Sequence, residues 1–229
     1  MKQNVALWRV SALLCVSLLS GCGIKYYDLV ESEFPQAAKE PDYREVAHGY
    51  KRSKTVYDEF ETKAVFDALW LSDDVRTAYV QMYAKKRGLA AEAKEELLKR
   101  QLEENRHWVS FYVLADIRER SAGMLGDSAS AWTMFMSVDK HKATVESVKE
   151  YDIEPEYQRL FGSTNMNFKT CYLVKFAILP ALATTISRQE FQYLELIIGS
   201  PKRKVVLDWH SDHLKPKKIL VSDEDFYWG

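Results

Sequence analysis

The sequence lacks a hydrophobic run long enough to cross a membrane. Its only strongly apolar stretch, VSALLCVSLL, covers residues 10–19, whereas a membrane-spanning helix needs roughly 20 such residues. Residues 1–21 contain Lys2 and Arg9 and no acidic residue. A basic start, a short apolar middle and small residues at the end are typical of a secretory signal peptide. Apolar side chains occur on every side of this run, which argues against an amphipathic helix of a cytosolic domain.

The residues that end the apolar run are Leu19, Ser20, Gly21 and Cys22. An aliphatic residue, two small residues and a cysteine resemble the lipobox of bacterial lipoprotein precursors. The resemblance implies cleavage before Cys22, a diacylglycerol on its thiol and an N-acyl lipid on its new amine. Since an Asp after the cysteine favours inner-membrane retention in the enteric members of this family, the resemblance implies that Gly23 at this position favours the outer membrane over the inner membrane. We therefore expect a protein of the bacterial cell envelope, held on the bilayer by its Cys22 lipids.

Cysteine is also scarce, with three in 229 residues. Cys15 lies in the expected signal peptide and Cys22 would carry lipid, so Cys171 is the one thiol left. No disulfide can form within such a mature chain, and its stability must come from packing. For Cys171 we favour a half-buried structural position on a strand over a reactive thiol.

An excess of charge of one sign is missing too. After loss of Lys2 and Arg9, 30 Lys and Arg residues face 33 Asp and Glu residues. This near balance gives no reason to expect nucleic acid as a partner. Short basic runs occur at 85–87, 202–204 and 215–218. We interpret them as solvated ends of elements, the alternative being contacts with anionic lipid headgroups or peptidoglycan.

Glycine and proline are few, at 9 and 6 residues, and 13% of residues are aromatic, so the chain is not disordered. Residues 22–50 show no sustained period and are predicted to be a tether. Alternating apolar residues over 56–70 predict a strand or a hairpin broken near residues 61–63. The capping sequence at Ser72 and the stop at Gly88 predict a helix, followed by a second one over about 90–106.

Further alternating segments predict strands near residues 108–115, 132–138, 143–150, 172–178, 191–198 and 204–209, with one helical turn over 155–161. We expect residues 51–229 to form one α+β domain. Its predicted core is a β-sandwich of about six to eight strands, immunoglobulin-like or related, with an inserted helical hairpin.

Motifs that carry chemistry are nearly absent. The sequence has no G-x-S-x-G, no phosphate-binding loop and no G-x-G-x-x-G, and we assign no catalytic residue or cofactor. The best cluster is Asp208, His210, Asp212 and His213, since imidazole and carboxylate groups bind zinc and similar ions. On a strand, 208, 210 and 212 would share one face, but this is not a known ligand set.

Residues 222–229, SDEDFYWG, join three acids to three aromatics. We expect them to dock on the domain; the alternative is an exposed anchor for a partner. For the whole protein, the leading hypothesis is a non-catalytic binding or assembly role toward envelope proteins or other envelope components. The alternative is a metal-dependent envelope enzyme that uses the cluster at Asp208, His210, Asp212 and His213.

Overall fold

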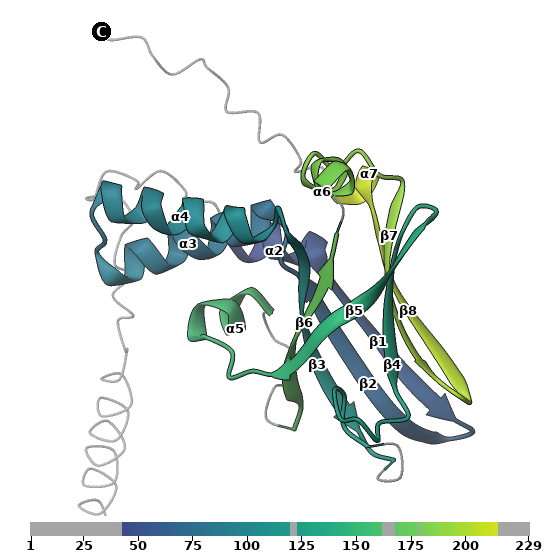
Figure 1. Ribbon diagram of the computed structural model, residues 1–229. Coiled ribbons are helices and arrows are strands. Elements are labelled where there is room, and N and C mark those ends of the chain that lie inside the picture. The colour runs from purple at the N-terminus through teal and green to yellow at the C-terminus, as the bar shows by residue number, and fades with distance from the viewer. Residues whose placement is uncertain (1–42, 120–122, 162–167, 179, 215–229) are drawn as a thin grey trace, which may run out of the picture. The chain divides into compact units, whose positions relative to one another are not determined.

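The computed structural model describes residues 43–119, 123–161, 168–178 and 180–214 (Figure 1). In chain order, the elements are α2 (Tyr43–Tyr50), β1 (Lys51–Asp58), β2 (Glu61–Trp70), α3 (Asp73–Arg87), α4 (Ala91–Glu104), β3 (Trp108–Ile117), β4 (Thr133–Val138), β5 (His141–Glu150), α5 (Pro155–Phe161), β6 (Thr170–Ala177), α6 (Pro180–Ser187), β7 (Tyr193–Ser200), β8 (Arg203–His210) and α7 (Ser211–Leu214). The protein is thus an α+β protein with a β-rich core.

The expected sandwich of two sheets is not confirmed. All eight strands belong to one antiparallel sheet, in the order β1-β2-β3-β6-β5-β4-β7-β8. The strand β5 connects the two groups of strands in this sheet. Its residues 141–144 pair with β4, and its residues 145–150 run beside β6, with an irregularity in the pairing between Val145 and Ser147. Such an irregularity bends a strand. Here it allows β5 to pair with β4 along its first part and with β6 along its second part.

The sheet curves until it is nearly closed into a barrel, so its two edge strands, β1 and β8, face each other. Side chains bridge these edges at both ends. Arg52 Nε of β1 donates a hydrogen bond of 2.6 Å to the carbonyl oxygen of Asp208 on β8. At the other end, Arg203 Nη2 lies 2.6 Å from the carboxylate of Asp58. These contacts protect strand edges whose backbone groups would otherwise be open to pairing with another chain.

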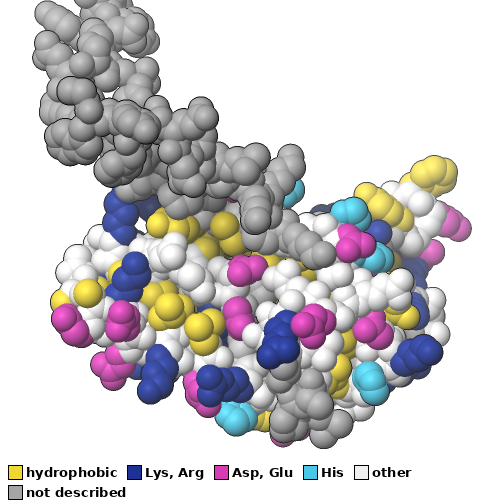
Figure 2. Space-filling model, turned by 90° about the horizontal axis from the view of Figure 1, so that it is seen from above, with side chains coloured by type: hydrophobic (Ala, Val, Ile, Leu, Met, Phe, Trp, Pro, Cys, Tyr) yellow, Lys and Arg dark blue, Asp and Glu magenta, His cyan; other side chains and the backbone are white. Residues whose placement is uncertain are grey.

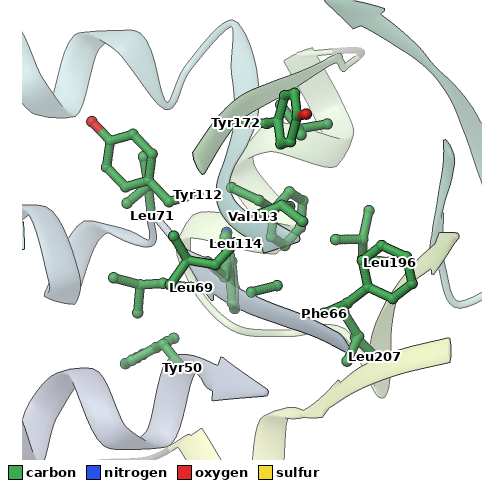
Figure 3. Close-up of a cluster of buried hydrophobic side chains, with 14 of the residues drawn as sticks. Tyr50, Phe66, Leu69, Leu71, Tyr112, Val113, Leu114, Tyr172, Leu196 and Leu207 are labelled. Carbon is green, nitrogen blue, oxygen red and sulfur yellow. The ribbon is translucent and has the colours of Figure 1, made fainter. Parts of the chain in front are cut away.

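The interior is filled by the alternate side chains that the period-two pattern predicts. Trp132, Met134, Met136 and Val138 are all buried, as their spacing on one face of the segment requires. Figure 3 shows Phe66 of β2, Leu196 of β7 and Leu207 of β8 gathered in this core. The fully buried Trp209 completes it from β8.

The predicted helical hairpin lies between β2 and β3 and begins and ends as its residues indicate. Ser72 Oγ accepts a hydrogen bond from the amide of Val75 at 3.3 Å, and Gly88 ends α3 in the left-handed conformation, with φ of 62°. With α5, this hairpin covers the outer face of the sheet over β3 and β6 (Figure 1). Tyr157 of α5 packs on Tyr112 of β3 with ring centroids 5.0 Å apart.

Three helices were not predicted, namely α2, α6 and the four-residue α7. The first comprises the last eight residues of the segment interpreted as a tether, and its Ala47 and Tyr50 are buried in the core. The Trp209 Nε1 donates a hydrogen bond of 2.8 Å to the carbonyl oxygen of Tyr50. The helix α2 is therefore packed into the folded domain.

The signal peptide, the lipobox residues 19–22 and residues 222–229 lie outside the described residues. Within the described part of the chain, no helix combines the length and apolar character required to cross a bilayer.

Candidate binding surface

The cluster that the sequence singled out is split between two elements. The strand β8 ends at His210, and the next four residues form α7. Asp212 and His213 therefore leave the strand, and the expected sharing of one strand face by residues 208, 210 and 212 is wrong for Asp212. The physical reason is the change from strand to helix at Ser211, which ends the alternation of side chains.

Asp208 and His210 do remain together on the outer face of β8. His210 Nε2 lies 3.1 Å from the carboxylate of Asp208, and the rings of His210 and His213 meet edge to face with centroids 6.0 Å apart. Both members of the pair are about half exposed. Among the residues that the structure describes, no group of three or more His, Cys, Asp or Glu side chains is arranged around a metal position.

Cys171 is buried in β6, opposite Leu114 of β3. Burial, reinforced by the nearby charge of Asp152, raises the pKa of this thiol to about 12. A thiol is a poor nucleophile until it loses its proton. The geometry therefore agrees with a structural role for Cys171.

Charged side chains under the helices hold the hairpin to the sheet. Arg76 of α3 is almost fully buried and donates hydrogen bonds to Asn105 at 2.7 Å and Gln101 at 2.6 Å. It also forms a 3.1 Å ion pair with Glu104, which in turn lies 2.5 Å from Lys175 of β6. Partners of this kind are what a buried guanidinium needs to offset its lost hydration, so we assign this network to stability.

The end of the molecule that carries α3, α4, α6 and α7 has charges of both signs. Viewed onto that end, the described part of the surface shows Lys and Arg side chains interspersed with Asp and Glu (Figure 2). A mixed surface of this kind has no strong field to attract a highly charged partner.

A different surface lies on the outer face of β4, β7 and β8, toward the β7–β8 turn and away from α6 and α7 (Figure 1). Here a hollow is lined by side chains from four strands and that turn, which we call the basic hollow: Phe135, Met136, Lys142, Ile197, Gly199, Ser200, Pro201, Lys202, Arg203 and Lys204. The strand pairing explains the assembly, because Phe135 of β4 stands opposite Ile197 of β7, and Gly199 stands opposite Lys204 of β8.

The floor of the basic hollow is apolar and open. Phe135 is 42% exposed although its neighbours Met134 and Met136 are buried. Alternation along β4 sends Phe135 to the outer face. Ile197 beside it is half-buried. An aromatic side chain left in this position is typical of an interaction surface rather than of a core.

The rim of the hollow is positively charged. Lys142, Lys202 and Lys204 are exposed, and none of them forms an ion pair with another described residue. Arg203 is held by Asp58, yet its buried Nη1 atom has no hydrogen-bond partner within the described ranges. Three exposed lysines around an aromatic floor suit a ligand with carboxylate and apolar groups.

Sequence reasoning noticed only part of this surface. It marked 202–204 as a basic run at the solvated end of an element and did not single out Phe135. The missing information was the pairing of β4 with β7, which joins residues that lie more than 60 positions apart. No family model matches this chain, and neither does any curated protein.

Proposed function

We propose that the chain is an outer-membrane lipoprotein, anchored through diacylglycerol and N-acyl lipid on Cys22, with a non-catalytic binding or assembly role. Its partner is an envelope protein or another envelope component, and the basic hollow is the surface that contacts it. The lipobox residues support the anchor. The observation that supports the binding role is the half-exposed Phe135 beside three lysines that lack ion-pair partners among the described residues.

The contact can be tested in cells with a photo-cross-linking phenylalanine analogue in place of Phe135. The matched control carries the same analogue at Lys99, an exposed position of α4. We expect irradiation to join an envelope component to position 135 and not to position 99, since only the first lies in the hollow. Equal capture at both positions, or capture at neither, would exclude the hollow as the binding surface.

The anchor has an independent test. Metabolic labelling with an alkyne fatty acid should mark the wild-type protein, and Cys22→Ser should abolish both the label and cleavage before residue 22. Lipid labelling that persists in Cys22→Ser would refute Cys22 as the attachment point. A Cys171→Ser control should keep the label, because that buried thiol is not part of the lipobox.

The alternative function, a metal-dependent envelope enzyme, is favoured by one observation, the 3.1 Å contact between Asp208 and His210. With His213 close by, two imidazoles and a carboxylate could bind zinc after rearrangement. Metal analysis of the purified protein distinguishes the two functions. Stoichiometric zinc that is lost on His210→Ala would support the enzyme, and protein that binds no zinc would exclude this site.

A further inference from the structure

We propose that residues 222–229 of the same chain occupy the basic hollow until a partner displaces them. The inference rests on the proposed function, because it takes the hollow to be the binding surface. It names the chemistry of the ligand that the surface selects, which is a short acidic segment followed by aromatic side chains.

The first argument is complementarity. Asp223, Glu224 and Asp225 are consecutive carboxylates, and three aromatic residues follow them. The hollow offers three exposed lysines without ion-pair partners in the described structure and the open ring of Phe135. The carboxylates of the segment thus have counterparts in the lysines, and its apolar side chains have a counterpart in Phe135, since charge-assisted hydrogen bonds and contacts with an aromatic ring are strong elements of such recognition.

The second argument is reach. The described chain stops at Leu214, just beyond the end of β8 that is farthest from the hollow. The eight residues of β8 span roughly 26 Å at about 3.3 Å per residue. An extended chain from 215 to 223 covers roughly 30 Å at about 3.3 Å per residue. A segment that turns back along β8 therefore brings its carboxylates to Lys202 and Lys204.

The third argument is the order of residue types. From α7 toward the turn, the outer face of β7 and β8 presents first the acids Asp208 and Glu195, then the apolar pair Val206 and Ile197, then Lys204. The segment beyond Leu214 has the complementary residue types in the same direction along this face. It is basic at 215–218, apolar at 219–221 and acidic at 223–225. A chain running back along this face meets an opposite charge at each end and an apolar neighbour between them.

The experiment uses the chain from residue 22 onward with Cys22→Ser, at low micromolar concentration, and a carbodiimide that joins a carboxylate to an amine in direct contact. We expect cross-links from Asp223, Glu224 or Asp225 to Lys202 or Lys204, located by mass spectrometry. In an equal mixture of isotope-labelled and unlabelled protein, these links should join segments of the same label.

The variant Lys202→Glu/Lys204→Glu has no amine at either position and cannot form these links, so the decisive variant is the charge reversal: Asp223→Lys/Asp225→Lys in that background should restore binding of the segment. Restoration is read from new links between residues 202 or 204 and the introduced lysines. The matched control Lys99→Glu changes charge on α4 and should leave the links intact. Because all three lysines are exposed, we expect each variant to keep its fold, and near-ultraviolet circular dichroism verifies this.

Links between differently labelled copies alone would show that a second molecule occupies the hollow and would overturn the proposal. So would links spread evenly over lysines of other faces, or no links at all. The photo-cross-link at Phe135 separates this inference from the proposed function. Capture of an envelope component without the 222–229 links overturns only the inference, whereas the links without any capture leave the occupant established and refute the binding role.

Discussion

The most informative stability test concerns α2, because the sequence placed it in a tether and the structure buries it. Tyr50 ends this helix and is 2% exposed. Its hydroxyl donates a hydrogen bond to Asp74 of α3 and accepts one of 2.8 Å from Gln189 Nε2. Its ring meets Trp70 edge to face with centroids 5.5 Å apart. Truncation at this position therefore removes core packing and two polar contacts together.

The expected magnitudes follow from these contacts. Tyr50→Phe keeps the ring and removes the hydroxyl, so it should lower the free energy of unfolding by about 1–2 kcal/mol. Tyr50→Ala also leaves a cavity beside Trp70 and should cost about 4 kcal/mol. The control Tyr57→Ala removes a side chain that is 64% exposed on β1, and it should change stability by about 0.5 kcal/mol or less.

Urea unfolding at pH 7, followed by tryptophan fluorescence, measures all three variants in the chain with Cys22→Ser. With an m value of about 2.5 kcal/mol per molar urea, Tyr50→Ala should lower the midpoint by roughly 1.6 M, and Tyr57→Ala by roughly 0.2 M or less. Equal midpoints for Tyr50→Ala and Tyr57→Ala would refute the assignment of α2 to the core. The hydrogen bond from Trp209 to the Tyr50 carbonyl survives in every variant, since it uses the backbone.

Three further predictions use other parts of the fold. Cys171 should react with a thiol reagent at pH 8 at least 100-fold more slowly in native protein than in urea, because burial raises its pKa to about 12; fast native labelling would contradict its buried position. Burial alone would raise the pKa of Glu104, but Arg76 and Lys175 outweigh it and lower that pKa below the usual 4.5. Its contribution to stability is therefore present above pH 4.5 and lost as the pH falls further, so the urea midpoint should drop less between pH 6 and pH 3 in Glu104→Gln than in wild type, and parallel profiles would disprove the linkage. Gly88→Ala should cost about 1 kcal/mol from the left-handed backbone alone, since no atom lies within 4 Å of an added Cβ; a urea midpoint unchanged from wild type would contradict this role.

Local patterns predicted most elements but missed α2, α6 and α7, and for α2 the cause is clear. Tyr43, Val46, Ala47 and Tyr50 follow helical spacing, and all four pack in or against the core. Only eight residues carry the signal, however, and isolated helices of that length are unstable without tertiary contacts. A helical period over only eight residues does not distinguish such a helix from irregular chain. The burial of these side chains is therefore known only from the structure.

The same limit applies to the basic hollow. The outward direction of Phe135 follows from the alternation of β4, and the basic run at 202–204 is visible in the sequence. The sequence does not show that these two features meet, because strand period specifies which face a side chain occupies and not which strand lies beside it. Pairing of β4 with both β5 and β7 is what brings Lys142, Phe135 and Lys204 onto one surface.

The departure from a sandwich depends on β5, the strand predicted over 143–150. In a sandwich, β5 would belong to one sheet, and each sheet would keep two free edges. Instead, its first four residues pair with β4 and its last six run beside β6, so β5 joins two groups of strands that would otherwise be separate sheets. Once these groups are continuous, the strands left at the ends are β1 and β8, and curvature brings them together. The contacts from Arg52 to Asp208 and from Arg203 to Asp58 follow from that closure. Arg203, one of the residues that line the basic hollow, thus also holds the closed sheet together, so the candidate binding surface depends on the same continuity through β5 that closes the sheet.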